Sequence, residues 1–204
     1  MARKEFVDIQ DGSGLGILLT RVQIVRAMLE MIGEKPDREG LRETPARVAK
    51  AWDEWFAGYD QDPAAVLKAF EDGAELMETD SMVIVRDIEF YTHCEHHMAP
   101  FFGKVHIGYI PNGKVVGLSK LARVADIFAK RLQVQERLTG QIAQALDDNL
   151  NPHGVGVVVQ ATHFCMCSRG VNKQGSTTIT SALKGTMKNE PECRAEFLRL
   201  LELK

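Results

Sequence analysis

The chain has 204 residues, with 25 Lys and Arg against 28 Asp and Glu, so its formal net charge is −3. A composition of 45% hydrophobic and 26% charged residues is typical of a soluble globular protein with one domain or two small ones. The near-neutral charge disfavours a protein that coats nucleic acid or a membrane surface. Since the chain shows neither a membrane-spanning apolar run nor the apolar core of a signal peptide, we expect a cytoplasmic protein.

The first third of the chain carries helical signals. Apolar residues recur every three or four positions from Ile17 to Ile32, and Gly33 follows as a helix stop. Thr44 and Asp62 each precede a proline, a pattern typical of a helix start.

From residue 81 the pattern changes to alternating strands and helices. We predict strands over 82–91, 103–110, 154–164 and 175–183, helices over 120–131 and 134–149, with Ser119 as a cap, and a helical tail over 192–201. Short links between consecutive strands favour antiparallel pairing and an α+β fold. A sheet of four strands leaves edges and one face uncovered, which favours self-association.

The densest chemical signal is the segment Tyr91–His97, which holds three of the six histidines and one of the four cysteines. Within it, Cys94 and His97 have a spacing that allows one thiolate and one imidazole to hold the same zinc ion. The pair alone is equally consistent with surface histidines beside a buried cysteine.

A second segment, His163–Arg169, strengthens the metal interpretation. It lies at the end of a predicted strand, where either Cys165 or Cys167 could add a third ligand, because alternate residues share one face. Three protein ligands would leave the fourth position open for water, as in catalytic zinc sites. A closed structural site that uses both cysteines is the alternative.

Histidines that are not metal ligands are candidates for proton transfer. His96 and His163 are candidates for proton transfer, because an imidazole titrates near neutral pH. The alternative is that each orients a metal ligand through a hydrogen bond. His93 and His106 are assigned to packing or cross-strand bonding.

Cations and a carboxylate near predicted helix starts are candidates for substrate binding. Lys120 and Arg123 share one face at a helix N-terminus, where phosphate could bind, although for this pair taken alone a solvated helix start is the favoured interpretation. Arg169 could bring a further cation towards the metal. Glu136 could accept two N–H bonds from a guanine edge, or be an exposed helix-start charge.

Together these segments resemble GTP cyclohydrolase I. The resemblance covers nearly all of the chain from Ile17, in order and at similar spacings, and rests on four motifs: GLRETPARVAKAW, CEHHMAPFFGKVHIGYIPNGKVVGLSKLARV, RLQVQERLTGQIA and ATHFCMCSRGV.

The resemblance implies the tunnelling fold, with a helix pair between two pairs of strands, and a homodecamer of two stacked pentamers with active sites between subunits. It divides the chain into a flexible arm over 1–16, a helical region over 17–80 and a catalytic domain over 81–204. It implies a zinc ion held by Cys94, His97 and Cys165. Cys167 stands where many relatives carry an apolar residue. The sequence does not specify a regulatory protein.

The implied reaction converts GTP and water to formate and 7,8-dihydroneopterin triphosphate through addition at C8 of guanine. By the same resemblance, the acid–base pair is His96 and His163. The implied substrate-binding residues are Glu136 and Gln135 for guanine, Lys120, Arg123, Arg169 and a neighbouring subunit's Lys50 for the triphosphate, and Ser119 for positioning.

Two rival functions share these features. A zinc-stapled binding module of the same fold would hold zinc but form no product. A related enzyme such as the nitrile reductase of this fold would need a cysteine nucleophile without zinc. Nucleic-acid binding would require a broad basic surface, which the net charge of −3 disfavours.

Overall fold

The computed structural model describes residues 6–10, 16–67, 69–70 and 81–202, and the chain divides into two compact units, Met1–Asp60 and Gln61–Lys204. The boundary expected at residue 80 lies outside the described residues, as do residues 1–5 and 11–15 of the predicted arm.

The first unit is a β-hairpin followed by two helices. Its elements are β1 (Phe6–Gln10), β2 (Gly16–Thr20), α1 (Arg21–Met31), α2 (Thr44–Trp55) and the short 3-10 helix η1 (Ala57–Asp60). The prediction of a helix from Ile17 is wrong, because residues 16–20 pair with β1 and Thr20 caps α1 through a reciprocal capping box with Gln23. The predicted stop at Gly33, which has φ +88°, is confirmed. A helix does begin beside Pro45, but the prediction of Thr44 as its cap is wrong, because Thr44 is the first helical residue and Glu43 precedes it as the N-cap.

The second unit consists of strands and helices of very different lengths. These are α3 (Pro63–Val66), β3 (Ala69–Phe70), β4 (Val83–Cys94), β5 (Pro100–Ile110), β6 (Val115–Val116), α4 (Leu118–Ala129), β7 (Leu132–Gln133), α5 (Gln135–Leu150), β8 (Gly154–His163), α6 (Phe164–Cys167), β9 (Thr178–Lys184), α7 (Gly185–Asn189) and α8 (Pro191–Leu201).

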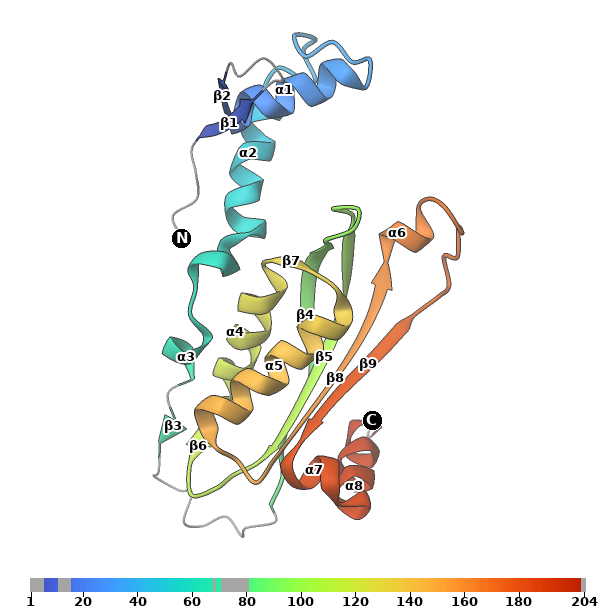
Figure 1. The fold of residues 1–204 in the computed structure, drawn as a ribbon. Coiled ribbons are helices and arrows are strands. Elements are labelled where there is room, and N and C mark those ends of the chain that lie inside the picture. Colours follow the sequence, from blue (N-terminus) through green and yellow to red (C-terminus); the bar gives the residue numbers. More distant parts are fainter. Residues whose placement is uncertain (1–5, 11–15, 68, 71–80, 203–204) are drawn as a thin grey trace. The chain divides into compact units, whose positions relative to one another are not determined.

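The main sheet has the order β7-β4-β5-β8-β9 (Figure 1). The four long strands pair antiparallel, as predicted, so the α+β class is confirmed. The described sheet has five strands instead of the expected four, because β7 adds a short parallel pairing beside His93 and Cys94. Ser119 does not cap α4: Gly117 precedes the helix and no side chain bonds to its first turn.

Helices α4 and α5 cover one face of the sheet, and the main core lies between these two helices and that face (Figure 1). Alternate residues of β5 and β8 point at the helices, so Val105, Ile107, Val157 and Val159 are fully buried. This packing fixes the register of the central strands, which pair from Ile110–Gly154 at one end to Phe101–His163 at the other.

A second, smaller core lies on the opposite face, at the Ile110–Gly154 end of the sheet. Its centre is Phe197 of α8, a side chain with 0% exposure that packs with Ile110 and Met187. Gly108 and Gly156 make room for its ring, since a Cβ atom on either glycine would lie 2.7 Å from it. The helical tail is therefore part of the folded core.

Truncation of this ring should be costly. We expect Phe197→Ala to lower the free energy of unfolding by about 3–5 kcal/mol, because the substitution leaves a cavity over two glycines that cannot fill it. The neighbouring Leu198→Ala is the control: Leu198 is 45% exposed, and its loss should cost less than about 1 kcal/mol. Urea unfolding at one fixed chain concentration measures both, and equal costs would contradict the packing argument.

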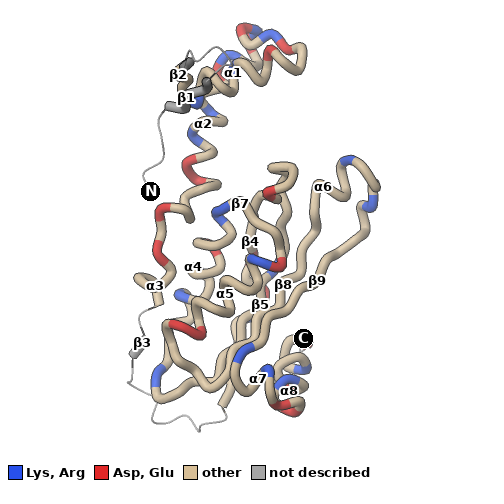
Figure 2. The backbone as a smooth tube through the Cα atoms, viewed as in Figure 1, with Lys and Arg blue, Asp and Glu red and all other residues tan. Residues whose placement is uncertain are grey.

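Within the described residues, no helix is both long and apolar enough to cross a bilayer. Basic and acidic positions are scattered over the described backbone, and basic positions occur both on α4 and in the loop after α6 (Figure 2).

Candidate metal centre and active site

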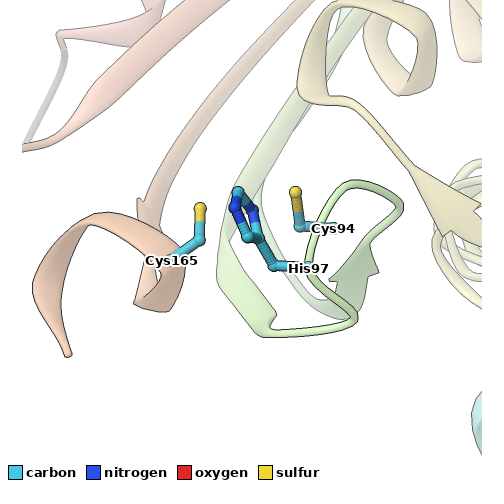
Figure 3. Close-up of side chains that lie close together, drawn as sticks. All are labelled: Cys94, His97 and Cys165. Carbon is cyan, nitrogen blue, oxygen red and sulfur yellow. The ribbon is translucent and has the colours of Figure 1, made fainter. Parts of the chain in front are cut away.

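Cys94, His97 and Cys165 meet at the end of the sheet remote from α8. Their candidate ligand atoms all lie within 4.8 Å of one another, and Figure 3 shows Cys165 approaching from a segment separate from the turn that carries the other two. Cys94 is buried, Cys165 is half-buried and His97 is exposed, so the cluster opens to solvent on the histidine side.

The turn that follows β4 holds Cys94 and His97 close together. The Cys94 N–H donates to the Ala99 carbonyl at 2.8 Å, and the Met98 N–H donates to the Cys94 carbonyl at 2.7 Å. Met98 adopts φ +52°, which is uncommon for a residue other than glycine. Glu95 fixes the outside of the turn by an ion pair with Arg137, and that hydrogen bond lowers the pKa of the Glu95 carboxyl.

Cys165 comes from α6, where the chain leaves the strand. The expectation that strand geometry governs Cys165 and Cys167 is wrong, because residues 164–167 form a helical turn. Cys165 approaches Cys94, whereas the Cys167 thiol donates to the Lys173 carbonyl at 3.5 Å. Burial, followed by the neighbouring Cys94 sulfur, raises the pKa of the Cys165 thiol, so metal binding must displace a proton from it.

His163 ends β8 and is held on two sides. Its ring stacks on Phe101, its cross-strand neighbour, with centroids 4.4 Å apart and planes 8° apart. Its Nε2 lies 2.7 Å from Oε1 of Gln135. Burial lowers the pKa of His163, and the nearby Glu136 carboxylate opposes that shift.

Two other candidates lie beside the cluster. Nδ1 of His96 is 3.7 Å from the Cys94 sulfur, and Arg169 donates from Nη1 to Nε2 of His97 at 3.1 Å. His106 is elsewhere: its Nδ1 accepts a hydrogen bond from the Asp87 N–H across β4 and β5, in agreement with the cross-strand role expected for it.

The basic side chains that we expect to bind the triphosphate are not all brought together within one chain. Ser119, Lys120 and Arg123 lie on the first half of α4, whereas the end of that helix leads into β7, which pairs with Cys94. At 1.5 Å per residue, Ser119 and Lys120 begin about 14–15 Å, and Arg123 about 9 Å, along the axis from the end of α4. Lys50 is exposed on α2 of the first compact unit.

The sequence did not predict that the His163 ring stacks on an aromatic side chain. Phe101 was not singled out, although the predicted antiparallel pairing could have indicated an aromatic residue opposite the end of β8. Gln135 is buried with 1% exposure, which differs from the accessible amide that contact with guanine would require.

Comparison with known proteins identifies the family. A family model described as GTP cyclohydrolase I matches residues 22–202. GTP cyclohydrolase 1 of Janthinobacterium sp. (strain Marseille) is 58% identical over 175 residues, which cover 86% of this chain and 87% of that protein. For Nitrosospira multiformis the identity is 55%, with coverages of 86% and 91%, and for Sinorhizobium fredii it is 49%, with coverages of 97% and 96%. As the sequence motifs predicted, the chain belongs to the GTP cyclohydrolase I family and is an enzyme of that type.

Proposed function

We propose that this enzyme is a zinc-dependent GTP cyclohydrolase I of the cytoplasm, which converts GTP and water to formate and 7,8-dihydroneopterin triphosphate. This is the first step of a pterin pathway. The observation that carries the proposal is the meeting of Cys94, His97 and Cys165 in a chain of this family. The antiparallel sheet with its helix pair supports assignment of the second unit to the tunnelling fold.

The donor set fits zinc. Two thiolates and one imidazole are ligands that Zn²⁺ prefers, and three protein ligands leave one tetrahedral position open. When bound, zinc supplies a Lewis acid that brings the pKa of water to about 7. Arg169, which already contacts His97, adds positive charge on the same side, where phosphate oxygens would find it.

His163 and His96 would move protons at the reacting purine and ribose. The lowered pKa of His163 favours a neutral imidazole that can accept a proton near pH 7. The exposed carboxylate of Glu136 lies close enough to influence His163 electrostatically, and would accept N–H bonds from the guanine edge. His96 is exposed beside Cys94, in reach of a substrate bound there.

The triphosphate site would be completed by a second copy of the chain. Ser119 and Lys120 lie about 14–15 Å, and Arg123 about 9 Å, along α4 from the end of the helix that leads to the cluster, so a neighbouring subunit is the simpler source of these groups. Among the described strands, β9 pairs only with β8, and most of β4 pairs only with β5, which leaves two edges for association into a ring. Both features support a homo-oligomer such as a decamer of two pentamers, to which Lys50 would also contribute.

The test of the function is incubation of the zinc-loaded protein with GTP. We expect formate release together with neopterin fluorescence after oxidation, in step with the zinc content. A zinc-loaded protein that yields neither product would exclude catalysis and favour the zinc-stapled binding module.

Loss of either proposed acid–base histidine should remove turnover and leave the metal in place. We expect His163→Ala and His96→Ala to lower kcat by about 10²- to 10⁴-fold at unchanged zinc content, because neither side chain belongs to the proposed ligand set. His153→Ala is the control, since His153 is exposed at the other end of the sheet and should keep full activity. Normal turnover in either active-site variant would reduce that histidine to a packing role.

A shared site predicts rescue between two inactive chains. Arg123→Ala and His163→Ala chains, each inactive alone, should regain activity when co-expressed, with about one quarter of sites intact in a random 1:1 assembly. If each site were built from one chain, every site would carry one lesion and the mixed oligomer would stay inactive. Differently tagged chains and two-step purification isolate the mixed species for the formate assay.

A further inference from the structure

Gln135, the first residue of α5, is a buried amide in direct contact with His163. Its exposure is 1%, and its Oε1 lies 2.7 Å from Nε2 of the histidine. A buried amide must satisfy two N–H donors and a carbonyl acceptor inside the protein. The partners of these groups determine which way the amide faces.

The amide orientation follows from two backbone carbonyls. Nε2 of Gln135 lies 3.1 Å from the Val159 carbonyl oxygen and 3.0 Å from the Thr178 carbonyl oxygen. A carbonyl oxygen can only accept, so the amide atom that faces both must be the nitrogen. The reversed amide would place three oxygens against one another, and Oε1 therefore faces His163.

Two threonines reinforce this orientation. The Thr139 hydroxyl donates to the Gln135 backbone carbonyl at 2.7 Å, so it must accept from the Thr180 hydroxyl, which is also 2.7 Å away. The Thr180 oxygen can then accept from Nε2 of Gln135, at 3.1 Å. The two amide hydrogens of Gln135 are thus shared among three acceptors of the chain. Neither hydrogen is left to bond to a guanine edge.

The same orientation determines the hydrogen position on His163. Since the amide oxygen can only accept, Nε2 of His163 must carry the hydrogen, and the lone pair of the neutral imidazole lies on Nδ1. Within the part of the chain that the structure describes, Nδ1 has no hydrogen-bond partner, and the stacked Phe101 ring restrains the imidazole plane.

We propose that Gln135 is a positioning residue that accepts the hydrogen bond from Nε2 of His163 and so fixes the orientation of that imidazole, with Nδ1 directed away from the amide. This role replaces the guanine contact expected for Gln135, and it rests on the proposed function because it needs His163 as an acid–base group. Guanine recognition then depends on Glu136 instead.

Gln135→Met tests the role, since methionine keeps the length of the side chain and removes the acceptor. We expect kcat to fall about 10- to 100-fold, with KM and the Kd for GTP changed less than about 2-fold. Gln144→Met, on the exposed side of the same helix, is the control for loss of a glutamine amide. Its amide donates to Asp148 and does not touch His163, so kcat should stay within about 3-fold. Glu136→Gln should show the opposite pattern, with a raised KM.

Two further variants keep the proposal falsifiable if Gln135→Met folds poorly. Gln135→Glu still accepts from Nε2–H, although its second carboxylate oxygen would face the Val159 and Thr178 carbonyl oxygens and should lower the Tm. Per folded, zinc-loaded chain it should retain more kcat than the methionine variant, at an unchanged KM. In the His163→Ala background, Gln135→Met should cause no further loss of the residual formate release, because the two residues act as one unit. A raised KM with kcat retained in either Gln135 variant, or additive losses in the double variant, would overturn the proposal. Wild-type protein without formate release would instead exclude the proposed function.

Discussion

Cys165→Ser is expected to abolish stoichiometric zinc binding, whereas Cys167→Ser should bind zinc like the wild type. Cys165 lies with Cys94 and His97 inside a 4.8 Å cluster, while the Cys167 thiol is engaged with the Lys173 carbonyl across its own loop. Removal of a direct ligand should lower zinc affinity by more than the roughly 10- to 100-fold that loss of an outer partner costs. Zinc content after dialysis, and competition with a chromophoric chelator, measure the difference.

Cys193→Ser serves as the control for cysteine loss in general, since Cys193 packs beside the second core, away from the cluster. It should keep zinc and activity. Zinc retained by Cys165→Ser but lost by Cys167→Ser would overturn the ligand assignment, and loss in both variants would favour a closed site with four protein ligands.

Gly103→Ala is expected to destabilise the fold by at least about 3 kcal/mol. Gly103 lies in the central strand β5, and a Cβ atom there would lie 1.9 Å from the Gln160 carbonyl oxygen and 2.7 Å from the Ala161 Cα. Both obstacles are backbone atoms of β8, so no side-chain rotation relieves the clash. The two strands would have to separate close to the Phe101–His163 pair, and activity should fall with stability.

The matched control is Gly140→Ala in α5. Apart from its chain neighbours and the backbone of its own helix, no described atom lies within 4 Å of a Cβ built there. Alanine favours a helix by about 0.5–1 kcal/mol over glycine, so this variant should be slightly more stable than the wild type. Urea midpoints at one chain concentration compare the two variants. Similar midpoints for Gly103→Ala and the wild type would show that β5 and β8 are spaced more loosely than the structure indicates.

Much of the second unit could be predicted from the sequence because its signals are local. Alternation along β5 and β8, together with the helical periodicity of α4 and α5, led to the observed order of elements. Prediction failed where a local signal conflicted with a distant pairing. Residues 17–20 carry a helical pattern but pair with β1, and Ser119 is a good capping residue that lies two residues after the N-cap position of α4, Gly117.

The candidate site was predicted in part for the same reason. The spacing of Cys94 and His97 is visible in the sequence, but the choice of Cys165 depends on a helical turn that strand periodicity did not indicate. The role of Gln135 could not be inferred at all, because it depends on two carbonyls from strands that come later in the chain. Hydrogen-bond geometry of that kind exists only once the sheet and α5 have packed.

The Phe197 ring over Gly108 and Gly156 has a consequence for the order of folding. The contact joins β5 and β8 to α8, which follows every strand of the sheet in the chain, so it cannot form during synthesis until α8 has left the ribosome. Until then two glycine-lined strands expose an apolar hollow, which makes the incomplete chain prone to aggregation. Such a high-contact-order closure should make the docking of α8 a late step, well after the local β4–β5 hairpin has formed.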